Sequence, residues 1–153
     1  MIEVTGDIFE QKDADCICFT SNGILNKNGD LVMGAGIAKE FKTKWRRLPE
    51  FFGRCIKKRG NTVFMMDIGE RRGEEHRILW ICNFPTKHHW KDPSDINLIK
   101  TSALELVKYS NLNKVNKIYL PRPGTGLGGL KWEDVKKVIE PILDDRFIVI
   151  NKE

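Results

Sequence analysis

The feature that most constrains the fold of this chain is a glycine-rich segment, Gly124 to Gly129, in which four of six residues are glycine. An apolar, strand-like run over 117–121 precedes it, and a helix-like pattern begins near Lys131. A loop that joins a strand to a helix lies at the carboxyl edge of the sheet, where open α/β sheets bind ligands. Glycine lets backbone N–H groups approach a ligand closely, and the helix start adds positive potential. The segment therefore predicts either an anion-binding loop or a tight turn.

A second glycine loop favours the ligand. Gly34 and Gly36 stand just before a helical pattern that begins at Ile37. Two glycine loops that each feed a helix N-terminus could hold the two phosphates of one pyrophosphate. Neither loop continues into the Gly-Lys-Ser/Thr of a P-loop, and neither has the full dinucleotide-binding fingerprint, so both of those site classes are disfavoured.

Short apolar runs alternate with helical patterns along the chain. This order predicts one α/β domain over residues 1–153, with a central sheet covered by helices on both faces. We expect strands at 1–4, 15–19, 62–68, 77–84, 117–121 and 146–150, and helices at 35–45, 48–59, 92–110 and 131–143. Asp92 or Ser94 is expected to cap the third helix, and Pro141 to disturb the last turn of the fourth.

Composition limits the partners and the compartment. Lys and Arg number 26 against 21 Asp and Glu, a formal net charge of +5, which fits either a polyanionic partner or a mildly basic surface. The four cysteines form no C-x-x-C pair, and the adjacent His88 and His89 make a poor metal pair, so we expect no metal, no cofactor and a reduced, cytoplasmic chain. The start does not read as a signal peptide, and no apolar run reaches membrane length.

Four segments in order resemble the macro domain family: "VTGDIFE", "MGAGIAKEF", "FPTKHHW" and "LPRPGTGLGGLKWEDV". The resemblance covers nearly the whole chain and implies a single macro domain, an ADP-ribose-binding module with a mixed sheet between helices. The chain is similar to the macro domains that remove ADP-ribose from DNA in toxin–antitoxin systems. It is also similar to the terminal ADP-ribose glycohydrolases that act on glutamate-linked ADP-ribose.

The resemblance assigns the binding residues. Asp7 would accept a hydrogen bond from the adenine amino group, with a turn or helix cap as the alternative, and Ile8 would offer its backbone N–H to the ring. The two glycine loops would wrap the phosphates and the distal ribose through Met33, Gly34, Ala35, Gly36 and Ile37, and through Pro121, Gly124, Thr125, Gly126, Leu127 and Gly128.

The resemblance also places two residues near the chemistry. Asn22 would contact the distal ribose hydroxyls, or serve only as a turn residue, and the segment 23–30 is longer than in the antitoxin relatives. Lys87 matches the position of the catalytic lysine, which would attack the opened sugar or stabilise charge as the bond breaks. Gly128 stands where the glutamate-ester enzymes carry an aspartate, which disfavours a mechanism that needs a loop carboxylate. His89 and Trp90 could pack against a substrate base or anchor the loop, and packing is preferred.

Four functions remain open on this basis. The leading one is hydrolytic removal of ADP-ribose from a modified macromolecule, with DNA among the candidates. The others are an ADP-ribose reader without turnover, a phosphatase or deacylase acting on ADP-ribose-1″-phosphate or acyl-ADP-ribose, and a nucleic-acid-binding protein whose glycine loops grip backbone phosphates. A catalytic Lys87 would distinguish the hydrolase from the ADP-ribose reader. A steep salt dependence of binding would indicate the nucleic-acid-binding protein.

Overall fold

The computed structural model describes residues 1–152 and contains a mixed sheet of six strands. In the sheet the strands lie in the order β1-β6-β5-β2-β4-β3. All neighbours are parallel except the β3–β4 pair. The strands are β1 (Ile2–Thr5), β2 (Cys16–Ser21), β3 (Met65–Arg72), β4 (Arg77–Pro85), β5 (Ile118–Leu120) and β6 (Phe147–Asn151). The predicted α/β fold is confirmed.

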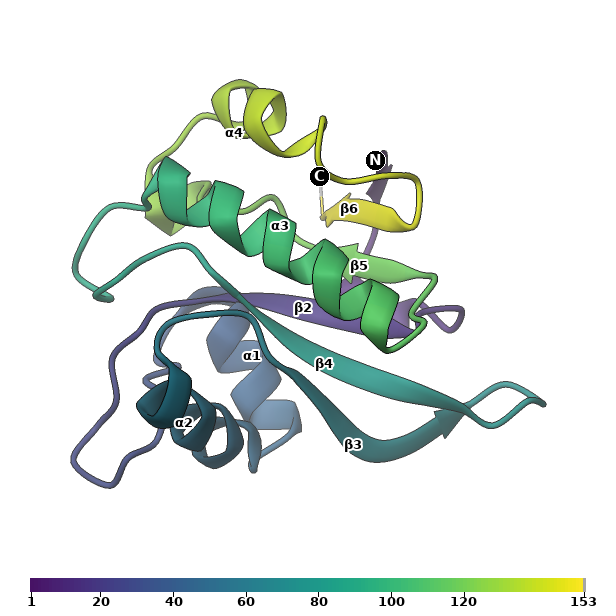
Figure 1. Cartoon of the computed structure of the whole chain (residues 1–153), viewed down its shortest axis with the longest axis horizontal. Coiled ribbons are helices and arrows are strands. Elements are labelled where there is room, and N and C mark those ends of the chain that lie inside the picture. The colour runs from purple at the N-terminus through teal and green to yellow at the C-terminus, as the bar shows by residue number, and fades with distance from the viewer. Residues whose placement is uncertain (153) are drawn as a thin grey trace.

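Helices cover both faces of this sheet. α1 (Gly36–Lys44) and α2 (Leu48–Arg59) lie on one face, and α3 (Ile96–Leu112) and α4 (Trp132–Ile139) lie on the other (Figure 1). Two 3₁₀ turns, η1 (Ile8–Glu10) and η2 (Gly126–Gly128), were not expected from the sequence.

The central strands β2 and β4 are largely apolar because each contributes to two cores. On β2, Ile17 and Phe19 pack into the core beneath α1 and α2, while Cys16 and Cys18 pack into the core beneath α3 and α4. Successive side chains of a strand point to opposite faces, so a strand buried on both sides loses the apolar–polar alternation.

Several boundaries differ from the expectation, and two of them have a clear physical reason. β3 begins at Met65 rather than 62, because Phe64 N–H donates to the Asn83 side-chain oxygen at 2.6 Å and ladder pairing starts only at Met65. α4 ends at Ile139, one turn before the expected end, since Pro141 supplies no N–H to continue the helix.

The cap of α3 also differs from the expectation. Asp95 is the N-cap, and its carboxylate accepts from Asn97 N–H at 2.9 Å and from Leu98 N–H at 3.4 Å. Ser94 is buried, and its backbone N–H donates to the Gly128 carbonyl at 3.0 Å, so it joins α3 to the glycine loop instead. Asp92 lies in the exposed turn before it.

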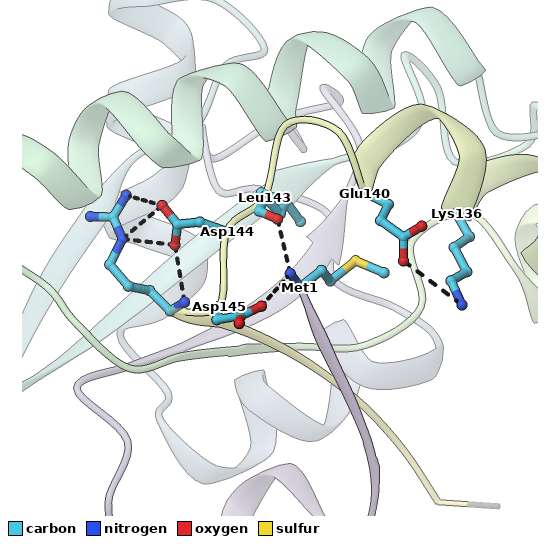
Figure 2. Close-up of polar contacts among 7 residues, drawn as sticks. Met1, Lys136, Glu140, Leu143, Asp144 and Asp145 are labelled. Atoms are coloured by element: carbon cyan, nitrogen blue, oxygen red, sulfur yellow. Dashed lines mark hydrogen bonds and ion pairs between the residues drawn. The ribbon is translucent and has the colours of Figure 1, made fainter.

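The start of β1 is tied to the connection between α4 and β6. The amino group of Met1 donates to the Leu143 carbonyl at 3.0 Å and pairs with Asp145 at 2.9 Å (Figure 2). In the same connection the Arg146 guanidinium holds the Asp144 carboxylate at 2.9 Å. These contacts fix the edge of the sheet beside β6.

Candidate functional site: a two-part cleft at the carboxyl edge of the sheet

A large cleft lies where the parallel strands end. It encloses about 910 Å³, within the range of small-molecule sites. Its walls include the residues that end or directly follow β2, β4, β5 and β6: Ser21 and Asn22, Thr86 and Lys87, Pro121 and Arg122, and Asn151. The sheet therefore gathers into one cavity segments that are far apart in the sequence.

The first glycine loop forms one wall of this cleft and leads directly into α1. Val32, Met33, Gly34, Ala35 and Gly36 all line the cavity. Ala35 is the N-cap of α1 and its side chain makes no capping hydrogen bond. The first N–H groups of the helix are therefore not satisfied by a side-chain cap, which suits an anionic ligand.

The second glycine loop forms the opposite wall, and its packing requires glycine at two positions. Gly124 has a φ of +77°, and a Cβ there would lie 2.6 Å from Ile99 Cδ1. A Cβ at Gly128 would lie 2.2 Å from Ser94 Oγ. The close contact with Ser94 explains why this position is glycine and carries no carboxylate.

A smaller cleft of about 450 Å³ adjoins the first. Gly6, Ile8 and Phe9 from the β1–η1 turn line it, together with Glu40 and Lys152. Gly36, Ile37, Pro121 and Asn151 line both clefts. The first glycine loop thus lies where the two clefts meet. A diphosphate that joins two larger groups, one in each cleft, would occupy this position.

The segment 23–30 is a short hairpin that leaves Asn22 in the cleft. Leu25 and Leu31 form a bridge, and Leu31 N–H donates to the Pro49 carbonyl of α2 at 2.8 Å. The Asn22 amide donates to the Val32 carbonyl at 3.0 Å and accepts from Ile24 N–H at 2.9 Å. Asn22 therefore closes the base of the hairpin while it lines the larger cleft.

Lys87 spans the mouth of the larger cleft. Its Nζ donates to the Leu127 carbonyl at 3.5 Å, a long contact that costs little to break. Leu127, with 76% of its surface exposed, extends toward the first loop, where its Cδ1 lies 3.8 Å from the position of a Cβ on Gly36. The two glycine loops thus approach each other at the cleft mouth, and Lys87 contacts the second.

Two buried hydroxyls line the cleft without a partner in the described protein. The Oγ atoms of Ser21 and Ser94 are both inaccessible and make no hydrogen bond with residues 1–152. Buried hydroxyls normally find a partner, so these two are exceptions among the residues that line the cleft.

The charge around the larger cleft is mostly positive. Lys87, Lys91 and Arg122 line it, against the single carboxylate of Asp92. Arg122 lies over the Trp132 ring, 5.2 Å from its centroid. This balance attracts polyanionic ligands.

Most of the site residues expected from the sequence meet in these two clefts. The larger is lined by Asn22, Met33, Gly34, Ala35, Gly36, Ile37, Lys87, Pro121, Gly124, Thr125, Leu127 and Gly128. The smaller is lined by Ile8, with Gly36, Ile37 and Pro121 shared.

Asp7 and Gly126 line neither cleft. Asp7 stands between the lining residues Gly6 and Ile8, and its carboxylate caps η1 by accepting Phe9 N–H at 2.9 Å. Gly126 has a φ of +63° and open space around the position of a Cβ. The structure thus shows the capping contact of Asp7, one of the two roles considered for it.

Sequence reasoning missed several residues of the cleft wall. Ser21 ends β2, and Thr86 directly follows β4. A polar residue at the end of a buried strand was the signal that could have revealed them as cleft residues. Ser94, Arg122 and Asn151 carry no local pattern that would reveal them.

Within residues 1–152, no group of three or more His, Cys, Asp or Glu side chains is placed to hold a metal ion. No helix in the same residues has the length and apolar character needed to cross a bilayer. The four cysteines are all free thiols.

Comparison with known proteins decides the family. The model of the macro domain family matches residues 26–139. The chain belongs to the macro domain family. The mixed sheet between two helical layers of this macro domain agrees with the fold that the resemblance implied.

Two groups of curated relatives are similar to this macro domain. A DNA ADP-ribosyl glycohydrolase of Mycobacterium tuberculosis is 39% identical over 112 residues, which cover 69% of this chain and 30% of the relative. The human ADP-ribose glycohydrolase OARD1 is 30% identical over 142 residues, which cover 92% of this chain and 82% of the relative. This macro domain therefore spans about 30% of the length of the first group and most of the length of the second.

Solved structures share the same architecture. The macrodomain of Mycobacterium tuberculosis DarG superposes with a TM-score of 0.81 at 28% identity, covering 97% of this chain and 95% of that one. The macrodomain of Thermus aquaticus DarG gives a TM-score of 0.76 at 28% identity, covering 99% and 97%.

Proposed function

We propose that this macro domain binds ADP-ribose across its two clefts and hydrolyses the bond that joins ADP-ribose to a macromolecule. The observation that carries the proposal is the continuous cleft in which two glycine loops face each other and Lys87 spans the mouth. The names of the relatives support it, since they are a DNA ADP-ribosyl glycohydrolase and an ADP-ribose glycohydrolase.

The clefts suggest how the ligand lies. Adenosine fits the smaller cleft, where Ile8 and Phe9 offer apolar surface and Asp7 stands beside them. The diphosphate then lies at Gly36, at the junction of the clefts and before the start of α1. The distal ribose enters the larger cleft, where the Asn22 amide lines the wall and can donate to and accept from its diol.

In this orientation the anomeric carbon of the distal ribose points to the mouth of the cleft, toward Lys87. Hydrolysis breaks the bond between that carbon and the macromolecule, and water supplies a hydroxyl to the sugar and a proton to the leaving group. Lys87 either attacks the opened sugar through its amine or stabilises charge as the bond breaks. No loop carboxylate is available at position 128, so we assign the chemistry to Lys87 rather than to an acid.

DNA is the preferred macromolecule. The charge of +5 and the basic mouth of the cleft both favour a polyanion over an acidic protein segment. We place the activity in the cytoplasm, because four unpaired cysteines fit a reducing compartment.

Two measurements test this function together. Calorimetry should detect binding of free ADP-ribose at a micromolar dissociation constant, about −8 kcal/mol. Chromatography should detect ADP-ribose released from a modified DNA strand, and less from ADP-ribosylated glutamate or ADP-ribose-1″-phosphate. Binding without release from any substrate would leave an ADP-ribose reader, and absence of binding at millimolar ligand would remove both functions.

A further inference from the structure

Trp90 is a large aromatic side chain left open to solvent at the mouth of the larger cleft. Its exposed fraction is 48%, and it lines the cleft together with Lys87 and Lys91. A tryptophan that anchors a loop normally buries its ring, so anchoring does not explain this exposure.

The turn that carries Trp90 is held without it. Asp92 N–H donates to the His89 carbonyl at 3.0 Å, and Lys91 N–H donates to His89 Nδ1 at 3.0 Å. His88 pairs with Asp95, the cap of α3, at 3.0 Å. Because these bonds fix the turn at both ends, the Trp90 ring is presented on a rigid base and is free to contact a ligand.

The surroundings of the ring combine aromatic and cationic groups. The His89 ring lies 5.2 Å from Trp90 at an interplanar angle of 33°, and Lys91 Nζ lies over the indole, 5.1 Å from its centroid. Lys87 and Arg122 extend the positive charge along the cleft mouth, and Asp92 is the one carboxylate among the cleft-lining residues. Aromatic faces beside Lys and Arg are the arrangement that binds single-stranded nucleic acid.

We propose that Trp90 and His89 form a stacking subsite for a nucleobase next to the modified nucleotide, so that the domain favours ADP-ribose on a single strand over ADP-ribose on an isolated nucleoside. This inference rests on the proposed function. A base competes with the exposed Lys91 side chain for the indole face, and the displaced ammonium then lies beside the phosphates of the strand. The subsite lies at the mouth of the larger cleft, outside the part that the proposed function gives to the distal ribose.

The position relative to Lys87 supports the assignment. Trp90 follows Lys87 by three residues in one turn, and both line the cleft mouth through which the macromolecule leaves the site. A strand whose modified base stands at Lys87 therefore passes the Trp90 ring with its neighbouring base.

The test compares two substrates that differ only in flanking nucleotides. One is a single ADP-ribosylated nucleoside, and the other carries the same modified base in the middle of a short DNA strand. Their kcat/KM values are measured for the wild type, Trp90→Ala, Trp90→Phe and Leu112→Ala. Leu112 is an exposed apolar residue at the end of α3 that lines neither cleft, and it serves as the matched control.

We expect the wild type to favour the strand, and Trp90→Ala to reduce this preference by about 5- to 150-fold, as loss of one stacked base does. Trp90→Phe should keep most of the preference, Leu112→Ala all of it, and every variant should bind free ADP-ribose like the wild type. Equal rates on both substrates in the wild type, or an unchanged preference in Trp90→Ala, would overturn the subsite. A Trp90-dependent preference for an ADP-ribosylated glutamate peptide would also overturn it. Failure of the wild type to act on either substrate would instead remove the proposed hydrolase.

Discussion

At the scale of single residues, the site separates binding from chemistry. In the proposed binding mode, the diphosphate and adenine contacts come from the glycine loops and the β1–η1 turn. Lys87 lies at the mouth, where its Nζ donates to the Leu127 carbonyl, its backbone N–H donates to the Ser21 carbonyl, and its own carbonyl accepts from the Asn61 amide. A residue placed in this way can be removed without dismantling the binding cleft.

Lys87→Ala is therefore expected to lower turnover of a modified DNA strand by about 10²- to 10³-fold, the usual effect of losing one group that stabilises developing charge. Its dissociation constant for free ADP-ribose should change by no more than about fivefold, since a half-exposed charge contributes up to about 1 kcal/mol to binding. Single-turnover kinetics and calorimetry measure the two effects. A variant that binds weakly and turns over normally at saturation would show that Lys87 is only a phosphate contact.

Gly126→Glu should abolish ADP-ribose binding while the fold is retained. Gly126 itself lines neither cleft, but its neighbours Thr125 and Leu127 line the larger one, so a glutamate side chain, with open space around it, adds bulk and negative charge at the rim of that cleft. Gly69→Glu is the matched control, because Gly69 also has a positive φ and open space, but it lies on β3 and its neighbours Ile68 and Glu70 line neither cleft. Normal binding by Gly126→Glu in calorimetry would show that the second glycine loop is only a turn.

At the scale of elements, the site depends on the start of α3. The Asp95 carboxylate caps the helix and pairs with His88, two residues before Trp90 in the same turn. The Asp95 backbone N–H donates to the Thr86 carbonyl at 2.8 Å. The hydrogen bond from His88 holds the pKa of the Asp95 carboxyl below its ordinary value. One side chain therefore connects a helix end to the turn that carries Lys87.

Asp95→Ala should lower the free energy of unfolding by about 1 kcal/mol, the usual cost of a lost N-cap. The exposed pair with His88 adds little to this because water screens it. Since the folded-state pKa is lowered, the ionised carboxylate stabilises the fold above the ordinary aspartate value of about 4, and this contribution is lost as the pH falls through the folded pKa. Urea unfolding at neutral and acidic pH checks both points, with Asp95→Asn, which retains a capping oxygen, as the control. An equal loss of unfolding free energy at neutral and at acidic pH would contradict a stabilising contribution from the ionised Asp95 carboxylate.

The same scale shows what the sequence could predict. Strands β2, β4 and β6 are short continuous apolar runs, and helices α1 to α3 follow the helical apolar periodicity, so their positions agree with the prediction within a few residues. The glycine loops and Lys87 could be located because their motifs are local. The pairing of Ser94 with Gly128 and the contribution of Asn151 depend on contacts between distant segments, which no local pattern encodes.

At the scale of the whole molecule, ADP-ribose would touch segments that follow β1, β2, β4, β5 and β6, on both sides of the sheet centre. A ligand that spans so many elements stabilises the fold as a unit. We expect ADP-ribose at about 100 times its dissociation constant to add about 2.7 kcal/mol to stability. This corresponds to a rise in melting temperature of roughly 5 to 10 °C for a domain of this size.

Differential scanning fluorimetry measures this shift, with AMP as the matched ligand because it fills only the smaller cleft. AMP at the same concentration should give a smaller rise. Equal shifts with both ligands would mean that the larger cleft does not take the distal ribose.

The approach of Leu127 to Gly36, together with the Lys87 contact to the Leu127 carbonyl, has a consequence for kinetics. A ligand whose diphosphate lies beneath that contact cannot leave sideways until the two loops separate. Release of ADP-ribose would then require the mouth to open first, a step that the long Lys87 contact makes easy. The mouth would thus set the path by which the product leaves, while the contacts of the adenine and the diphosphate would set how long it stays bound.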